Sequence, residues 1–597
     1  MSTYAARLAA LREQLKSDRL DGFVVPLTDE HMSEYVGSYA QRLAWLTGFQ
    51  GSAGSAVVLP EQAAIFVDGR YTLQVRAQVD GEHWSYQSVP ETSIADWLKA
   101  NAPQGARIGY DPWLHTRDWV EKAREALADK GAELVPVRRN PVDAVWADKP
   151  EPSRARLIVH SDSLAGRSSA AKRQEMADWL KSQKADSAVL AALDSIAWTL
   201  NVRGQDVEHT PVALSFAVVH ADGTADLFVD SEKVGPDVRQ HLGNGVRLHE
   251  RHAFEPWLAG QGGKVVAVDP ERSVAAIFGA LDKAGAKVIA RRDPSVLPKA
   301  IKNEVEIAGH RAAQARDGAA LSRFLHWLSV EAPKGGVDEL GAAAKLHALR
   351  QACGDLRDLS FDTISGAGPN GAIVHYRVTE ETNRPLERDS LYLVDSGGQY
   401  PDGTTDVTRT VAIGTPSAEM RDRFTRVLKG HVGVARAIFP DGTRGSQLDS
   451  LARQYLWQAG LDYAHGTGHG VGSFLSVHEG PQRISPAGSG QPGGDEPLRA
   501  GMILSNEPGY YKTGAYGIRV ENLVLVVARE IEGAERKMLG FETLTFAPID
   551  RALIETGMLS PGERNWIDRY HAKVLEVVGP QLEGEVRAWL EAQCAPL

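Results

Sequence analysis

The sequence has very few cysteines, no long apolar run and no block of like charge. Cys353 and Cys594 are the only cysteines among 597 residues, so we expect neither a disulfide framework nor a thiolate metal site. No segment approaches the ~18 consecutive apolar residues that span a bilayer. The formal net charge of −11 includes no concentrated basic segment, which argues against nucleic acid as a partner. These absences predict a soluble, cytoplasmic protein that acts on neither membranes nor nucleic acid.

The N-terminal segment, MSTYAARLAALREQLKSDRL, is amphipathic rather than continuously apolar. Charged residues interrupt the apolar core that a signal peptide needs, so we do not expect one. Tyr4, Leu8, Leu11 and Leu15 instead recur at helical spacing, which predicts one apolar face of a helix.

The first half of the chain contains an internal repeat. Trp45 in RLAWLTG aligns with Trp198 in SIAWTLN, and IFVDGR (65–70) aligns with LFVDSE (227–232). Each copy alternates helical and strand-like segments, which is typical of α/β domains. The segment ADKPEPSRAR (147–156), rich in proline and charge, marks the boundary between the copies.

The length exceeds what one hydrophobic core supports, so several domains are expected. We expect an α/β domain at 1–150, its repeat at 151–300, and a third domain at 301–597 with a helical extension from about residue 550. The third domain opens on a long amphipathic helix that begins near Val305. After this helix we expect strands around 391–411 and a helix over 420–439. Two loops follow, HGTGHGVGS (465–473) and ISPAGSGQPGGDEPLRAG (484–501), and then strands over 501–511 and 516–527.

Acidic residues in this domain stand beside apolar strands. An acid there is costly if it is buried, unless a cation or hydrogen-bond donors meet it. With one histidine they form a set of four carboxylates and one imidazole: Asp395, Asp406, His469, Glu507 and Glu521. Four carboxylates carry a charge of −4, which two divalent cations would neutralise, and paired cations activate water for hydrolysis. Oxygen-rich ligation with a single imidazole favours manganese.

Each member of this set also has an ordinary explanation. Asp395 and Asp406 flank a turn signal, PDG at 401–403, and turn aspartates are common. Glu521 is harder to explain as a loop acid, because it precedes a long apolar run. Arg519, two residues before Glu521, could hold one of the metal-binding carboxylates in place. By default Arg70 in VDGRY is a solvated turn residue.

The ordered set is more specific than its members. Asp395 and Asp406, GTGHG, NEPG and IRVEN together resemble the metal site of the pita-bread metallopeptidases, which include methionine aminopeptidase, prolidase and aminopeptidase P. Two repeated creatinase-like N-terminal domains before the catalytic domain resemble the long cytosolic form of aminopeptidase P. FQGSAGSAVV (49–58), DGRY (68–71) and WTLNVRG (198–204) are similar to stretches of that form.

The resemblance implies a homodimeric, manganese-dependent enzyme that removes the first residue from peptides whose second residue is proline. It implies that the five acidic and histidine residues bind two metal ions. His375, His465 and His478 match three active-site histidines that bind no metal, position substrate and stabilise the intermediate, and the metal ligand His469 is expected to contact substrate as well. Arg70 matches an arginine that reaches the substrate. We expect hydroxide formed between the metals to attack the carbonyl before proline, with Glu507 as the general base.

Three rivals remain on the same fold. A prolidase would cleave only Xaa-Pro dipeptides, and a binding protein would keep the fold without catalysis. A creatinase-like enzyme would act without metal. The complete ligand set disfavours the last two, and the C-terminus, RAWLEAQCAPL, lacks the acidic run of the histone-binding relatives.

Overall fold

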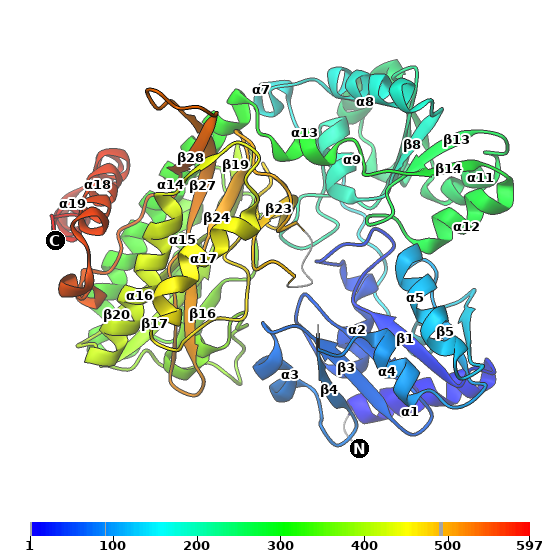
Figure 1. Ribbon diagram of the computed structural model, residues 1–597, viewed down its shortest axis with the longest axis horizontal. Helices are drawn as coiled ribbons and strands as arrows, with labels where there is room; N and C mark the ends of the chain where they lie inside the picture. The colour runs from blue at the N-terminus through cyan, green and yellow to red at the C-terminus, as the bar shows by residue number, and fades with distance from the viewer. Residues whose placement is uncertain (1–2, 90, 489–492) are drawn as a thin grey trace. The chain divides into compact units, whose positions relative to one another are not determined.

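A computed structural model describes residues 3–89, 91–488 and 493–597 (Figure 1). Residue contacts divide the chain into two compact units, Met1–Val296 (unit 1) and Leu297–Leu597 (unit 2). Among the helices of the described residues, none combines the length and apolarity needed to cross a bilayer.

Unit 1 contains two six-stranded sheets. The strands of the first sheet are β1 (Gly22–Pro26), β2 (Ser55–Val58), β3 (Ala63–Val67), β4 (Ser85–Ser88), β5 (Arg107–Tyr110) and β6 (Glu133–Pro136). Those of the second are β8 (Ser187–Leu190), β10 (Phe216–His220), β11 (Ala225–Phe228), β12 (Val246–His249), β13 (Val265–Val268) and β14 (Lys287–Ala290). A short pair, β7 (Ile158–Val159) and β9 (Val202–Arg203), stands apart from both.

The two sheets share one topology. The first is ordered β4-β3-β2-β1-β5-β6 and the second β12-β11-β10-β8-β13-β14. In both, two antiparallel pairings lie in the middle (β1–β2 and β2–β3; β8–β10 and β10–β11), and the remaining neighbours are parallel. The predicted pair of repeated α/β domains is therefore confirmed.

Helices cover the sheets of unit 1. They are α1 (Thr3–Ser17), α2 (Arg42–Thr47), α3 (Thr72–Gln78), α4 (Ile94–Asn101), α5 (Arg117–Ala128), α6 (Pro141–Val145), α7 (Asp162–Ala165), α8 (Ser169–Gln183), α9 (Leu193–Leu200), α10 (Pro236–Leu242), α11 (Phe254–Ala259) and α12 (Ala275–Ala284). Alternate residues of β1 pack on opposite faces: Phe23 and Val25 join the core that contains α1, and Val24 joins the core of α4 and α5. Burial on both faces explains why this strand is continuously apolar.

Unit 2 is built on antiparallel strands. Three small sheets use β15 (Asp358–Leu359), β16 (Ile364–Ala367), β17 (Ser390–Ser396), β18 (Gly398–Tyr400), β19 (Gly403–Thr404), β20 (Val407–Ile413), β25 (Gly509–Lys512) and β26 (Tyr516–Arg519). A six-stranded sheet, ordered β21-β28-β27-β24-β22-β23, uses β21 (Ile438–Pro440), β22 (Gly468–Gly470), β23 (Glu479–Ile484), β24 (Ile503–Asn506), β27 (Asn522–Arg529) and β28 (Met538–Thr543).

Helices flank these sheets. They are α13 (Val296–Ala300), α14 (Glu304–Glu331), α15 (Glu339–Ala352), α16 (Ala418–Ala435), α17 (Gly445–Trp457), α18 (Pro561–Val578) and α19 (Gly584–Gln593). In Figure 1, α16 and α17 lie over the strands on the side turned to the viewer. The long helix predicted near Val305 is α14, which begins where the Asn303 side chain caps the backbone N–H groups of Val305 and Glu306. The helical character predicted from about residue 550 is also found.

Four local predictions differ from the structure. The strand expected over 501–511 is interrupted at Glu507 and Pro508. His469, expected in a loop, lies in the short strand β22. The helix expected over 420–439 ends at Ala435, and Ile438 and Phe439 belong to β21. The strand expected over 516–527 is interrupted at Val520 and Glu521. The predicted loop over 484–501 includes residues 489–492, which lie outside the described residues; its described part after Ile484 forms neither helix nor strand.

Candidate metal centre

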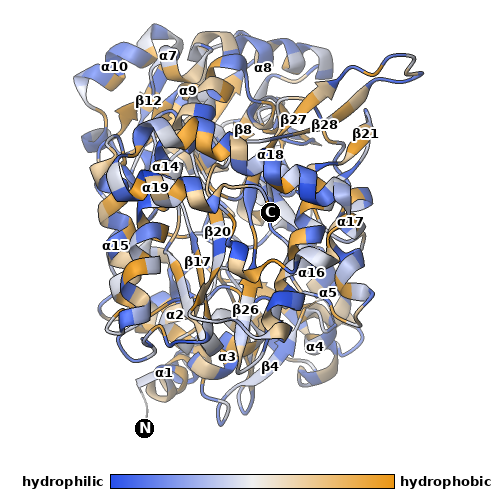
Figure 2. Cartoon of the chain, turned by 90° about the vertical axis from the view of Figure 1, so that its left-hand side faces the viewer, coloured by the Kyte–Doolittle hydropathy of each residue, from blue (hydrophilic) through white to orange (hydrophobic). Residues whose placement is uncertain are grey.

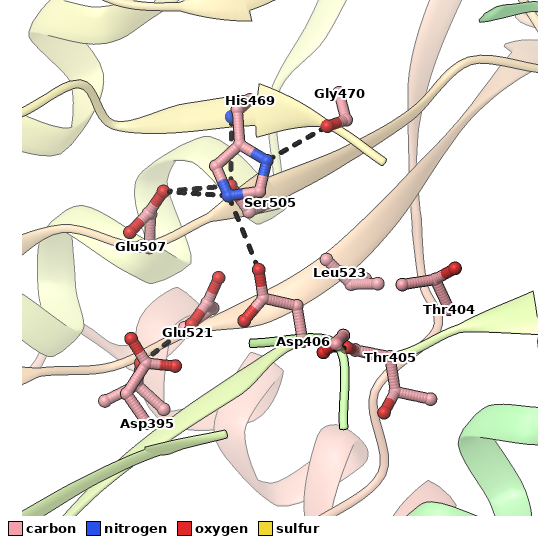
Figure 3. A network of polar contacts seen from close by, with 12 residues as sticks. Asp395, Thr404, Thr405, Asp406, His469, Gly470, Ser505, Glu507, Glu521 and Leu523 are labelled. Atoms are coloured by element: carbon pink, nitrogen blue, oxygen red, sulfur yellow. Dashed lines mark hydrogen bonds and ion pairs between the residues drawn. The ribbon is translucent and has the colours of Figure 1, made fainter. Parts of the chain in front are cut away.

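Five elements of unit 2 bring the predicted acids and histidine together (Figure 3). Asp395 lies near the end of β17, and the apolar residues before it are buried, so its side chain enters the interior. Asp406 precedes β20, which pairs antiparallel with β17. His469 is in β22, Glu507 follows β24, and Glu521 stands between β26 and β27.

The five side chains point toward a common space (Figure 3). The ligand-type atoms of Asp406, His469 and Glu521 all lie within 4.8 Å of one another. His469 Nε2 is 3.4 Å from Asp406 Oδ2 and 3.5 Å from Glu507 Oε1. Asp406, His469 and Glu521 are all buried.

The hydrogen bonds of His469 fix what its ring presents to the carboxylates. His469 Nδ1 is 3.0 Å from the carbonyl oxygen of Gly470, so Nδ1 carries the proton and donates it. In the neutral ring Nε2 is then an acceptor, and its lone pair faces two carboxylate oxygens. This arrangement is unfavourable unless a cation lies between them.

Two carboxylate oxygens in the site are buried without a partner. Asp395 Oδ1 and Glu521 Oε1 accept no hydrogen bond from the described residues. Burial raises the pKa of Asp406 well above its usual range, and the negative charge of Asp395 raises it further. Burial and the charges of Asp406 and Asp395 do the same to the pKa of Glu521. Buried polar atoms are normally satisfied, so this donor set fits divalent cations.

Arg519 supports the site from one side. It is 1% exposed, and its Nη2 donates to Asp395 Oδ2 at 2.7 Å. Its Nε donates to Thr408 Oγ1 at 3.2 Å, and that hydroxyl donates to Glu521 Oε2 at 2.7 Å. The one guanidinium therefore contacts Asp395 directly and Glu521 through Thr408. Arg519 was predicted from the sequence to hold one carboxylate of the site, and the carboxylate that it bonds directly is that of Asp395.

A second hydrogen-bond chain reaches His465. Arg519 Nη1 donates to the Tyr511 hydroxyl at 2.7 Å, and this hydroxyl is 2.8 Å from His465 Nε2. His465 Nδ1 is 2.7 Å from the Gly466 carbonyl oxygen, so it carries the proton and Nε2 accepts from Tyr511. His465 is thereby oriented relative to Asp395.

The remaining predicted residues are placed as follows. The rings of His478 and His469 are 4.3 Å apart, edge to face. His375 is half-buried and follows Val374, whose carbonyl oxygen accepts from Arg519 Nη1 at 3.3 Å. Arg70 belongs to unit 1, where Asp68 holds its guanidinium through Nε and Nη2.

Three residues that position this site were not predicted from the sequence. Tyr511 joins Arg519 to His465, Thr408 bonds Glu521, and Ser505 Oγ accepts from the His469 backbone and donates to Glu507 Oε1 at 3.1 Å. Two of them carried a signal. Thr408 and Ser505 each stand two residues from an acid of the set, as expected of side chains that share one side of an extended segment.

Family models match almost the whole chain. Two matches to the "Creatinase/Prolidase N-terminal domain" cover residues 7–144 and 148–306. "Metallopeptidase family M24" covers 308–528, and the "C-terminal region of peptidase_M24" covers 537–597. These matches agree with two α/β domains before a pita-bread domain.

Individual relatives match over the full length. "Probable Xaa-Pro aminopeptidase P" of Laccaria bicolor is 41% identical over 99% of this chain and 93% of its own, and the protein of the same name from Aspergillus fumigatus is 39% identical over 99% and 92%. The crystal structure of X-prolyl aminopeptidase from Caenorhabditis elegans, described as a cytosolic enzyme with a di-nuclear active site, matches with a TM-score of 0.94 at 35% identity and covers 100% of both chains. The chain therefore belongs to the Xaa-Pro aminopeptidase P family of M24 metallopeptidases.

Proposed function

We propose that this protein is a metal-dependent aminopeptidase that releases the N-terminal residue from peptides with proline in second position. The observation that carries the proposal is the buried set of four carboxylates and one imidazole, with two unpartnered oxygens, in a chain that is similar over its full length to Xaa-Pro aminopeptidases. The same set argues against a binding protein that has lost catalysis and against a metal-free enzyme.

We assign two divalent cations, most simply manganese, to Asp395, Asp406, His469, Glu507 and Glu521. The choice of manganese rests on the oxygen-rich donor set. Cations bound there would supply Lewis acidity and a water molecule of lowered pKa. Arg519 keeps the Asp395 carboxylate oriented toward the site.

Glu507 is the proposed general base. Its Oε1 accepts from Ser505 Oγ, which fixes one carboxylate oxygen. The carboxylate takes the proton of the attacking water and passes it to the departing proline nitrogen. That nitrogen belongs to a tertiary amide with no N–H, so it needs a proton to leave and offers none to the site.

The histidines act on the peptide. We assign His375, His465 and His478 to positioning the substrate and stabilising the negative charge that develops on the carbonyl oxygen, with His469 close to the substrate as well. The Tyr511 hydroxyl holds the ring of His465 for this role. We assign Arg70 to substrate binding on the strength of the family resemblance.

We further propose a cytoplasmic homodimer with domains at 1–150, 151–300 and 301–597. A cytoplasmic location is supported by the Caenorhabditis elegans relative, described as a cytosolic enzyme. The dimer follows from the family resemblance, and sedimentation of the purified chain tests it.

Substrate length separates an aminopeptidase from a dipeptidase. The manganese-loaded protein is given Arg-Pro-Pro, Arg-Ala-Pro and the dipeptide Arg-Pro, and free arginine is measured. We expect arginine release from Arg-Pro-Pro and none from Arg-Ala-Pro. Turnover of Arg-Pro with an inert Arg-Pro-Pro would instead identify a dipeptidase.

A further inference from the structure

A groove of about 540 Å³ in unit 2, separate from the metal centre, is lined by three arginines. Arg436 follows the last residue of α16, Arg529 is the last residue of β27, and Arg569 lies in α18. The rest of the lining includes Thr543, Asn565, Trp566, Phe541 and Ile438. We call this feature the arginine groove. In Figure 2, α18, β28 and β21 lie in the same part of the molecule.

The three guanidinium groups lack carboxylate partners. Within the described residues, no Asp or Glu oxygen lies within 4.0 Å of Arg436, Arg529 or Arg569, and none of the groove-lining residues is acidic. Arg311, another exposed arginine of unit 2, by contrast makes a two-armed ion pair with Glu542. The groove is therefore a local concentration of positive charge on a chain of net charge −11.

The position of Arg436 adds to this charge. A Cβ built on Gly562 would lie 3.0 Å from both Nη1 and Nη2 of Arg436, so the guanidinium rests on the first turn of α18. The N-terminus of a helix carries a partial positive charge, and cations there are unfavourable. An anion bound between Arg436 and the other two arginines would offset the repulsion of Arg436 by the helix N-terminus and the repulsion among the three guanidinium groups.

The groove also has a flat apolar part. Trp566 is half-buried, and its ring is stacked on Tyr570 at 5.3 Å and 3°. Phe541, which also lines the groove, is buried, whereas Ile438 is 55% exposed. Arg529 Nη2 donates to the main-chain carbonyl oxygen of Phe541. A stacked aromatic side chain next to three guanidinium groups without carboxylate partners suits a ligand that combines an anion with a ring.

We propose that the arginine groove binds a small organic phosphate, with the phosphate held by Arg436, Arg529 and Arg569 and the ring against Trp566. Guanidinium groups match the oxygens of a phosphate in pairs, which gives geometric selectivity as well as charge attraction. This site is independent of peptide hydrolysis, because none of its residues belongs to the metal centre.

Calorimetric titration of the manganese-loaded protein tests the site. The probes are adenosine 5′-monophosphate, adenosine and inorganic phosphate, which separate the contributions of the ring and the anion. We expect the monophosphate to bind more tightly than either of the other two. Arg529→Gln and Arg569→Gln should each weaken its binding about tenfold, as expected for one lost charged hydrogen-bond pair.

The matched control is Arg311→Gln, because Arg311 is an exposed arginine of the same unit that lies outside the groove. The affinity of this variant for the monophosphate should equal that of the wild type. Circular dichroism checks that the variants are folded. Absence of binding at millimolar monophosphate, or equal binding by wild type and an Arg529→Gln/Arg569→Gln double variant, would overturn the proposal. Equal affinities for inorganic phosphate and the monophosphate would overturn the contact with Trp566.

Discussion

Arg519→Lys perturbs the support of the metal centre without removing a proposed ligand. The wild-type guanidinium donates to four partners: Asp395, Thr408, Tyr511 and the Val374 carbonyl. A lysine has a single nitrogen, so it can keep one or two of these partners and leaves the others buried without a donor. Each such loss costs about 1–3 kcal/mol, and a broken buried ion pair costs about 3–5 kcal/mol. We therefore expect the free energy of unfolding to fall by about 3 kcal/mol.

The same change should loosen the metal ions. Loss of a residue that orients a ligand lowers metal affinity or activity by about 10- to 100-fold. Manganese affinity is measured by titration, and kcat/KM with Arg-Pro-Pro. Arg350→Lys is the control, because Arg350 is fully buried and bonds Asp317 through two nitrogens. It should lose comparable stability and keep wild-type manganese affinity. If Arg519→Lys also kept wild-type manganese affinity, our account of how Asp395 is oriented would be wrong.

Three further outcomes are expected. Because burial and mutual repulsion raise the pKa values of Asp406 and Glu521, manganese should displace protons from the metal-free protein and bind more tightly as pH rises; calorimetry in buffers of different ionisation enthalpy would contradict this if no proton were released. Tyr511→Phe removes the donor to His465 Nε2, so kcat should fall about tenfold with little change in KM and a shifted pH profile; an unaltered kcat would contradict the role of the hydroxyl. Burial lowers the pKa of His571 to about 3, below its value in the unfolded chain, so the free energy of unfolding falls by about 1.4 kcal/mol per pH unit as pH drops below ~6.5 and His571 is protonated on unfolding. His571→Gln should remove this contribution to the pH dependence of stability, measured by urea unfolding. An identical pH dependence in wild type and variant would refute it.

The repeat and the order of the domains could be predicted because local pattern determines them. Several inner strands of unit 1, such as β1, β3 and β13, are short apolar runs, and the two copies keep the same succession of strands. Burial on both faces, as in β1, makes such strands visible in the sequence. The paired topology of the two sheets follows from that succession.

The acids of the candidate site were visible for a related reason. Asp395 follows four residues that are all buried, so the chain places a carboxylate in the interior. A buried carboxylate needs positive charge, and the grouping of the five residues in one site was implied by the resemblance of their ordered motifs to the pita-bread metallopeptidases. Which oxygens remain unpartnered depends on side-chain directions that the sequence does not contain.

The network around Arg519 could not be predicted in the same way. Tyr511 reaches His465 because the hairpin of β25 and β26 folds beside the glycine-rich segment, and no spacing in the sequence encodes that contact. The strand around His469 was missed because two of its three residues, Gly468 and Gly470, are glycines, so it carries no alternation of polar and apolar side chains. The arginine groove could not be predicted either, because its three arginines come from segments far apart in the sequence.

The central claim is that Asp406 and its neighbours bind the metal ions that hydrolysis requires. The most direct measurement is arginine release from Arg-Pro-Pro by the wild type and by Asp406→Asn, first with metal removed and then with manganese restored. We expect the wild type to be inactive without metal and to recover with manganese, while folded Asp406→Asn stays inactive in both conditions. Full activity of the metal-free wild type, or of Asp406→Asn with manganese, would contradict it.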